Sequence, residues 1–302
     1  MTPRFHQVEA IKWIMALLQK GQRRGVVQMP TGSGKSYVAM CVVLEWLRMG
    51  GHATILAPSE EVITQLQLLA LQLGLCPVIE KAELRASRFA RLVIGSFHTM
   101  WRRYEDHKKP RSLVILDECH HFNFDAPTNL KIASIFDYAI GFSATPWSNG
   151  CMDFFENQVH VYPLSQAVVD GVCCGYALCP WREPTPGRYQ VVYCSGLDEI
   201  QAMCGRIAPS DYAVYQQKHA RETISRFRFG ALGTIVVNRM LTEGFDQPQI
   251  KRVWIARETE SQIFALQMAG RALRPYQGQR AEIYVASDTT YQTLQSAITQ
   301  AG

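Results

Sequence analysis

The sequence predicts an α/β protein of two domains in series, each built around a mostly parallel sheet covered by helices. Short apolar segments alternate with segments of helical periodicity, and this alternation occurs twice along the 302 residues, on either side of a Pro- and Gly-containing segment, 180–187. Strands that are apolar along their whole length are typical of parallel sheets with both faces buried. We expect a first domain at residues 1–148, a crossover at 149–187 and a second domain at 188–302.

The first series begins with a helix, because apolar residues recur at helical spacing from Val8 to Leu18 and Gly21 follows as a stop. Apolar strands and helices then alternate until a strand that ends in two acidic residues, and one more strand follows. We expect strands at 25–29, 53–57, 92–95, 113–117 and 138–143, and helices at 37–47 and 60–73.

The second series has the same alternation, with helices between successive apolar strands. Its strands are expected at 189–194, 212–215, 234–237, 252–256 and 282–286, and its helices at 197–206, 217–228 and 261–273.

The composition excludes several classes of protein. With 47% apolar and 19% charged residues the chain is globular, and its formal charge of +5 favours polyanionic partners only mildly. The nine cysteines include no Cys-x-x-Cys pair, and the group Cys173, Cys174 and Cys179 does not have the spacing of a usual metal site, so we expect reduced thiols. No apolar segment reaches the roughly 18 residues of a membrane helix. We expect a monomer in a prokaryotic or viral-host cytoplasm, with the nucleus as an alternative.

A Gly-rich loop between a strand and a helix predicts a phosphate site. It is Met29-Pro-Thr31-Gly32-Ser33-Gly34-Lys35-Ser36. The glycines let backbone N–H groups converge on phosphate oxygens, Lys35 would reach the β- and γ-phosphates of ATP, and Ser36 would bind Mg²⁺. Met29 stands where the strict pattern has glycine, and the alternative interpretation is a Gly-rich turn without a ligand.

The strand at 113–117 supplies the expected partner, because it ends in Asp117 and Glu118. A carboxylate at the end of a parallel strand can hold Mg²⁺, here Asp117, and its neighbour Glu118 can orient and deprotonate the attacking water. The alternative is a structural acidic turn. We expect Cys119, the next residue, to be a packed thiol and not a nucleophile.

With these two motifs the sequence resembles superfamily 2 helicases of the DExH type over nearly the whole chain. The resemblance implies two RecA-like domains with ATP bound in the cleft between them. Arg4-Phe-His-Gln7 resembles the adenine-recognition element of the family, with Gln7 contacting the base and Arg4 nearby. Residues 57–60 and 95–99 occupy the places of backbone-gripping motifs, and Ser143-Ala-Thr145 matches the motif that links hydrolysis to domain movement.

In the second domain, 191–195 stands at the place of the fourth motif, Thr242-Glu-Gly244-Phe-Asp246 resembles the fifth, and residues 267–274 resemble the sixth. The resemblance implies that Gly244 and Asp246 contribute to the nucleotide site. It also implies that Gln267 senses the γ-phosphate and that Arg271 and Arg274 act on it as arginine fingers. Met268 replaces the first arginine of the family's sixth motif, and 57–60 departs from the family's usual pattern.

The motif variants are nearer to the restriction, repair and recombination branch of the superfamily than to DEAD-box RNA helicases. The expected activity is therefore a Mg²⁺-ATP-driven helicase or translocase on DNA, without sequence specificity and without a membrane. An RNA helicase, an ATP-gated nucleic-acid clamp that does not travel, and a nucleotide kinase are the alternatives. Two basic stretches with aromatic residues, 101–111 and 226–229, are candidates for nucleic-acid contact or ordinary charged surface.

Overall fold

The structure is a computed structural model, and the chain divides into two compact units. The first holds residues 1–30 and 34–163, and the second holds residues 31–33 and 164–302. The structure describes residues 2–81, 84–87, 89–147, 150–207, 210–213, 219–238, 241, 245 and 247–301. For residues 101, 106 and 210–213 it describes the backbone but not the side chains.

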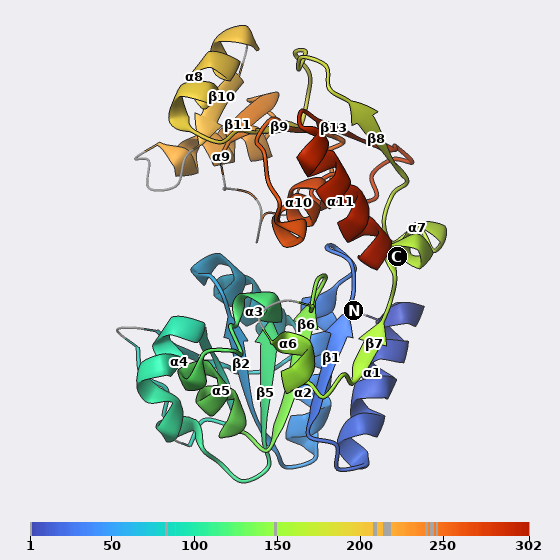
Figure 1. The fold of residues 1–302 in the computed structure, drawn as a ribbon. Helices are drawn as coiled ribbons and strands as arrows, with labels where there is room; N and C mark the ends of the chain where they lie inside the picture. The colour runs from blue at the N-terminus through green and yellow to red at the C-terminus, as the bar shows by residue number, and fades with distance from the viewer. Residues whose placement is uncertain are drawn as a thin grey trace. The chain divides into compact units, whose positions relative to one another are not determined.

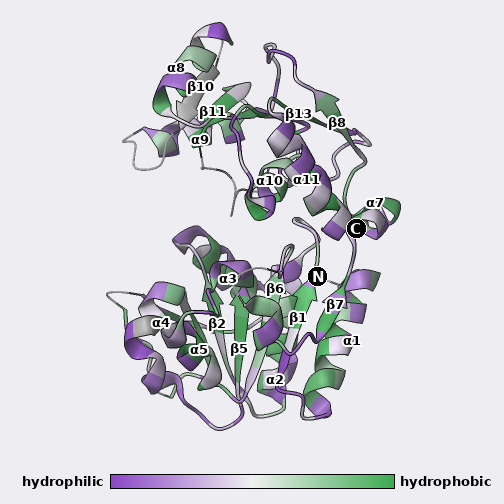
Figure 2. Cartoon of the chain, in the orientation of Figure 1, coloured by the Kyte–Doolittle hydropathy of each residue, from purple (hydrophilic) through white to green (hydrophobic). Residues whose placement is uncertain are grey.

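The first unit is a seven-stranded sheet in the order β3-β4-β2-β5-β6-β1-β7, and every neighbouring pair is parallel (Figure 1). Its central strands consist almost entirely of buried residues, which is why they have no polar face in the sequence (Figure 2). The strands are β1 (Arg24–Gln28), β2 (His52–Ala57), β3 (Val78–Glu80), β4 (Leu92–Ser96), β5 (Ser112–Asp117), β6 (Tyr138–Ser143) and β7 (Val159–Val161).

Helices cover this sheet. The first three in the chain pack in sequence order, α1 against α2 and α2 against α3, while α4 packs against α5. An aromatic cluster that includes Phe97, Phe122 and Phe155 is buried next to β5 and fixes the turn that follows this strand. The helices are α1 (Phe5–Gln19), α2 (Lys35–Arg48), α3 (Glu60–Gln72), α4 (Phe97–Arg103), α5 (Pro127–Ser134) and α6 (Cys151–Phe154), with 3₁₀ turns η1 (Tyr104–His107) and η2 (Cys119–His121).

The second unit is a six-stranded parallel sheet in the order β10-β11-β9-β12-β13-β8. Its core gathers Val192, Val236 and Trp254 from three neighbouring strands. The strands are β8 (Tyr176–Pro180), β9 (Gln190–Tyr193), β10 (Ser210–Ala213), β11 (Thr234–Val237), β12 (Arg252–Ile255) and β13 (Ala281–Val285); the helices are α7 (Leu164–Val169), α8 (Leu197–Arg206), α9 (Ala220–Arg228), α10 (Gln262–Gly270) and α11 (Asp288–Ala301).

The fold class expected from the sequence is confirmed, with two parallel sheets in tandem, each with its own helices. The expected strands are all present within a few residues. The structure adds three strands that the sequence analysis missed, namely β3, β7 and β8, together with helices α4, α5, α6, α7 and α11. The missed strands lack fully buried apolar runs, since most of their residues are half-buried.

The segment expected as a crossover, residues 149–187, is divided between the two units. Strand β7 pairs with β1 in the first sheet, and β8 pairs with β13 in the second. The chain passes from one unit to the other between Pro163 and Leu164. Among the helices that the structure describes, none combines the length and the apolar character needed to span a bilayer.

Candidate nucleotide-binding site

The phosphate-type loop lies between the end of β1 and the start of α2, as the sequence predicts. Gly34 precedes the first helical residue and has φ 91°, a left-handed conformation that favours glycine. A Cβ at Gly34 would also lie 2.3 Å from Nε2 of Gln7. Glycine is therefore favoured at position 34 by its backbone conformation, and any larger residue there would displace the Gln7 amide.

Gln7 reaches the loop from the first turn of α1. Its side chain is 7% exposed, and its Oε1 accepts a hydrogen bond of 2.9 Å from the backbone N–H of Arg4. His6 is stacked on Tyr162 with ring centroids 4.5 Å apart. These contacts fix the start of α1, so the amide of Gln7 is held beside the loop, while the Arg4 side chain is exposed.

The structure brings the loop and the acidic strand end together, although they are distant in the sequence. Lys35 Nζ lies 3.3 Å from Glu118 Oε1 and 3.5 Å from the carbonyl oxygen of Met29. Ser36 Oγ donates to Asp117 Oδ2 at 3.3 Å. Because β1 and β5 run parallel in one sheet, their carboxyl ends lie at the same edge, where the loop and the two carboxylates meet. Thr31, Gly32 and Ser33 form the rest of the loop.

The two adjacent carboxylates make this edge electrostatically unusual. Burial and then the charge of Glu118 raise the pKa of Asp117 to about 7, although Lys35 and the hydrogen bond from Ser36 oppose the shift. Asp117 Oδ1 accepts a hydrogen bond of 3.1 Å from the backbone N–H of Glu118. A buried carboxylate whose charge is poorly compensated is suited to bind a cation.

The residues present fit Mg²⁺. This ion takes oxygen ligands, keeps several waters, and is held in nucleotide enzymes by one or two protein oxygens together with the phosphates. Asp117 and Ser36 supply a carboxylate and a hydroxyl at one point. Among the described residues there is no group of three or more His, Cys, Asp or Glu side chains arranged for a metal, so a closed protein cage, including one built on Cys173, Cys174 and Cys179, is not found there.

A histidine that the sequence analysis did not assign joins this site. His120 Nδ1 lies 3.5 Å from Glu118 Oε2 and 2.9 Å from Ser143 Oγ, and His120 is 3% exposed. Ser143 Oγ also accepts the backbone N–H of Thr145 at 2.9 Å. The chain at Glu118 has φ 49°, and this turn directs His120 toward the end of β6. The clue in the sequence is the fourth residue of Asp117-Glu-Cys-His120; the neighbouring His121 is exposed.

In the second unit, Arg271 and Arg274 donate hydrogen bonds to the same backbone carbonyl oxygen. Arg271 Nη1 donates to the carbonyl oxygen of Phe245 at 2.7 Å, and Arg274 Nη1 donates to the same oxygen at 2.8 Å. Phe245 belongs to the fifth-motif segment, whose Gly244 and Asp246 lie outside the described residues.

The two arginines are also close to a buried tyrosine and to α10. Burial raises the pKa of Tyr193, and the charges of Arg271 and Arg274 partly oppose this shift. Gln267 lies half-buried in the last turns of α10, and Arg271 follows the helix directly. The residues predicted to act on the γ-phosphate therefore form one group in the second unit.

The first basic stretch serves the structure of the first unit in part. Arg103 Nη1 forms a 2.6 Å ion pair with Glu80, which is 1% exposed. Lys109 Nζ donates to the carbonyl oxygen of Ala90 at 2.5 Å, and the Arg111 guanidinium lies over the Trp46 ring. In the same stretch, Arg102 is exposed.

The second basic stretch, 226–229, contains one buried and one exposed aromatic residue. Phe227 is fully buried and stacks on Phe245, so it cannot stack on a nucleic-acid base. Phe229 is 80% exposed. The alternation of basic and aromatic residues in the sequence does not distinguish these two positions, whereas the helical phase of α9 does.

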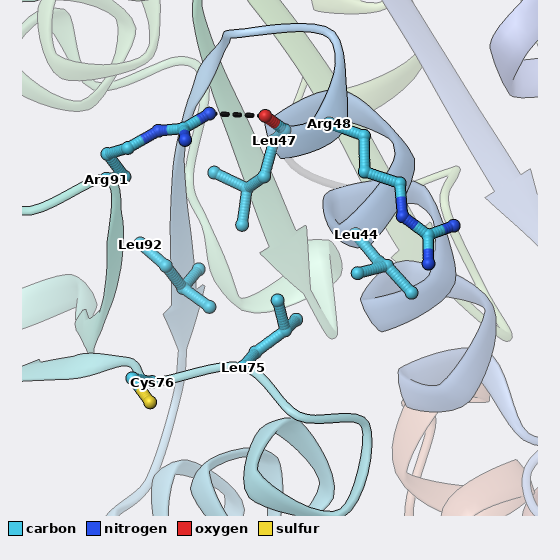
Figure 3. Close-up of a pocket in the computed structure, with 7 residues that line it drawn as sticks. All are labelled: Leu44, Leu47, Arg48, Leu75, Cys76, Arg91 and Leu92. Carbon is cyan, nitrogen blue, oxygen red and sulfur yellow. Dashed lines mark hydrogen bonds between the residues drawn. The ribbon is translucent and has the colours of Figure 1, made fainter.

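A cavity of about 330 Å³ lies at the opposite, amino edge of the first sheet (Figure 3). Arg91 Nη2 donates there to the carbonyl oxygen of Leu47, at the end of α2. Its lining is mainly leucine and includes no residue of the phosphate-type loop. The lining residues are Leu44, Leu47, Arg48, Leu75, Cys76, Arg91 and Leu92.

Part of the chain resembles known proteins in sequence. Residues 1–148 match the family model described as type III restriction enzyme, res subunit. A putative helicase of a Sulfolobus islandicus filamentous virus is 31% identical over 157 residues, which cover 47% of this chain and 28% of the viral protein. The chain thus spans less than a third of the length of that relative.

Two solved structures share the fold. A fragment of a putative HsdR subunit of a type I restriction enzyme from Vibrio vulnificus is 18% identical, with a TM-score of 0.77 over 97% of this chain and 65% of that one. Dbp5 of S. cerevisiae, solved with RNA and ADP BeF3, is 15% identical, with a TM-score of 0.70 over 100% of this chain and 88% of that one. The chain therefore shares with these structures a fold of two parallel-sheet domains in tandem, and its residues 1–148 match the restriction-enzyme family model.

Proposed function

We propose that the protein hydrolyses Mg²⁺-ATP and couples hydrolysis to movement along nucleic acid or to its unwinding. One observation carries this proposal: Lys35 and Ser36 of the phosphate-type loop meet Glu118 and Asp117 at one edge of the sheet. This is the arrangement that ATP hydrolysis requires, with a cation for the phosphates, oxygen ligands for a metal ion, and a carboxylate base.

Each residue of the first unit then has a role. Lys35 binds the β- and γ-phosphates, and Ser36 and Asp117 hold Mg²⁺, which neutralises charge on the phosphate oxygens when bound. Glu118 orients the attacking water and accepts its proton. His120 contacts Glu118 and Ser143 and thereby fixes the direction of the base. Gln7, beside the loop, recognises the adenine, with Arg4 nearby.

The second unit contributes the γ-phosphate contacts of the proposal. Arg271 and Arg274 act as arginine fingers, Gln267 senses the same phosphate, and Gly244 and Asp246 complete the site. The sequence supports this division of roles, because the second domain carries two grouped arginines and no phosphate-type loop of its own.

DNA is the proposed substrate. The support is the similarity of residues 1–148 to a restriction-enzyme family and of the fold to an HsdR subunit of a type I restriction enzyme. Dbp5 was solved with RNA, and RNA is therefore the alternative to be compared directly. We propose that the contacts go to the backbone, without sequence specificity, and that the protein acts as a monomer in a cytoplasm.

The test is the rate of ATP hydrolysis with single-stranded DNA, duplex DNA, branched DNA and RNA. We expect strong stimulation by DNA, which Lys35→Ala or Glu118→Gln abolishes. A rate that no polynucleotide changes would refute the motor. A strand- or triplex-displacement assay then distinguishes a motor from an ATP-gated clamp, because a clamp binds and hydrolyses ATP without displacing a strand.

A further inference from the structure

Three successive backbone carbonyls behind α10 accept hydrogen bonds from Cys174 and Lys251, two residues that lie just before strands of the second sheet. The Cys174 thiol donates to the carbonyl oxygen of Ala272 at 3.3 Å. The backbone N–H of Cys174 donates to the carbonyl oxygen of Leu273 at 2.8 Å. The ammonium of Lys251 donates to the carbonyl oxygen of Arg274. Lys251 Nζ also lies 3.8 Å from Cys174 Sγ. These two residues, the Cys174–Lys251 clamp, thus hold a continuous piece of main chain.

This main chain needs such partners because the helix ends there. The backbone N–H groups of Arg271, Ala272 and Leu273 still bond to carbonyls three residues back. The next carbonyls have no helical donors, since the chain turns away at Pro275, which has no N–H. A cationic ammonium at this end of a helix is also favoured by the helix dipole.

Both clamp residues are fixed to the sheet. Lys251 directly precedes β12, and its carbonyl oxygen accepts the N–H of Glu282 at 2.8 Å. Cys174 directly precedes Gly175, whose carbonyl oxygen accepts the N–H of Ala281 at 2.8 Å. Each clamp residue is 8% exposed, and burial lowers the pKa of Lys251 while Cys174 opposes the shift. The clamp is therefore a rigid, nearly dry connection.

Arg274 is consequently held at both ends. Its carbonyl oxygen is bound by Lys251, and its guanidinium donates to the carbonyl oxygen of Phe245 at 2.8 Å. We propose that Cys174 and Lys251 are positioning residues that aim Arg274, and with it Arg271, at the γ-phosphate. This inference rests on the finger role that the proposed function gives these arginines. It also explains why a cysteine and a buried lysine, distant in sequence, stand beside the sixth-motif segment.

The experiment measures kcat and KM for ATP in the full chain at saturating DNA. Lys251→Met keeps the length of the side chain and removes its donors. We expect kcat to fall about tenfold to a hundredfold, as for small misplacements of catalytic groups, while KM for ATP changes less than about threefold. Lys251→Arg, which keeps a cationic donor, recovers part of the rate. Cys174→Ala lowers kcat in the same way, and Cys174→Ser restores it in part.

A mutant cycle separates positioning from general destabilisation. In an Arg274→Ala background, Lys251→Met should lower kcat no more than about twofold further, because the arginine that it aims is gone. The control is Ser261→Ala, which removes the side chain that accepts the N–H of Phe264 at the other end of α10, at 3.3 Å. We expect this control to lower the melting temperature and leave kcat within about twofold.

Three results would overturn the inference, and they differ in what else they overturn. If Arg274→Ala lowers kcat but Lys251→Met and Cys174→Ala, both folded, do not, the clamp has no positioning role and the proposed function stands. If Lys251→Met lowers kcat by the same factor with and without Arg274, Lys251 affects the rate by a route other than Arg274, and the positioning role is wrong. If Arg274→Ala itself leaves kcat unchanged, both the finger role and the clamp are wrong. A variant that does not fold is replaced by its conservative partner, Lys251→Arg or Cys174→Ser.

Discussion

Lys35 Nζ lies 3.3 Å from Glu118 Oε1, so the lysine of the phosphate-type loop is paired with the proposed catalytic base. Lys35 is 6% exposed and Glu118 22% exposed, which makes this a largely buried ion pair. A nucleotide phosphate that binds Lys35 must therefore compete with Glu118. When it does, the carboxylate is released toward water, where the mechanism requires it.

The first prediction concerns Glu118→Gln. This change removes the charge that competes for Lys35 and also removes the base. We expect ATP to bind at least as tightly as in the native protein, while hydrolysis falls about 10²–10⁴-fold. Nucleotide titration and single-turnover hydrolysis measure the two effects separately. Glu61→Gln, an exposed carboxylate in the first turn of α3, is the control and should change neither.

The second prediction compares two glycines at opposite ends of α2. Gly34 and Gly50 have φ 91° and 83°, and alanine at either position costs roughly 1–2 kcal/mol of unfolding free energy. A Cβ at Gly50 meets nothing within 4 Å, whereas at Gly34 it meets the Gln7 amide. We expect Gly34→Ala to abolish ATP binding and Gly50→Ala to preserve it. Calorimetric titration with Mg²⁺-ATP decides, and equal affinities in the two variants would contradict the placement of Gln7.

The architecture was predictable from the sequence because local patterns determine it. Strands such as β5, buried at every residue, are continuous apolar segments with helices between them. Strands β3 and β7 were missed because each has only three residues and pairs at an end of the sheet order. Helix α11 was missed because half of its residues are Thr or Gln, with few apolar residues to mark its buried face.

The site residues were predictable from the sequence only where they lie together in one local motif. The loop at Lys35 and the carboxylates at Asp117 and Glu118 are local patterns, and the structure brings them within bonding distance. The contact of His120 with Ser143, and the clamp of Cys174 on the chain behind α10, join elements that are distant in sequence. Periodicity and spacing carry no information about such contacts, since they depend on how the sheet orders its strands.

The third prediction tests the basic stretch that precedes β5. Arg103→Met leaves the carboxylate of Glu80, 1% exposed, without its 2.6 Å ion pair. Because Arg103 is itself 24% exposed, we expect a loss of about 2–3 kcal/mol, below the full value for a buried pair. Arg102→Met, at the exposed neighbour, should change stability by less than about 0.5 kcal/mol. Urea unfolding checks both values, and equal stabilities would mean that Arg103 has no structural role.

The fourth prediction concerns stability at alkaline pH. Burial, followed by the charge of Glu199, raises the pKa of Cys194 from 9.0 to about 12. Between these values the folded state keeps a proton that the unfolded state releases. The stabilising contribution of Cys194 is therefore complete below pH 9 and is lost as pH rises toward 12. Cys194→Ala should lower the unfolding free energy by roughly 1 kcal/mol at pH 8, from the lost burial of Sγ.

This deficit of Cys194→Ala should shrink steadily as the pH rises to 10.5, because only the native protein loses the contribution of the thiol. The buried Tyr193, whose pKa burial also raises, is present in both proteins and cancels in the difference. Urea unfolding of both proteins in reductant at several pH values measures the two curves. If they stay parallel from pH 8 to 10.5, the Cys194 thiol titrates equally in the folded and unfolded states, and its side chain is in contact with water.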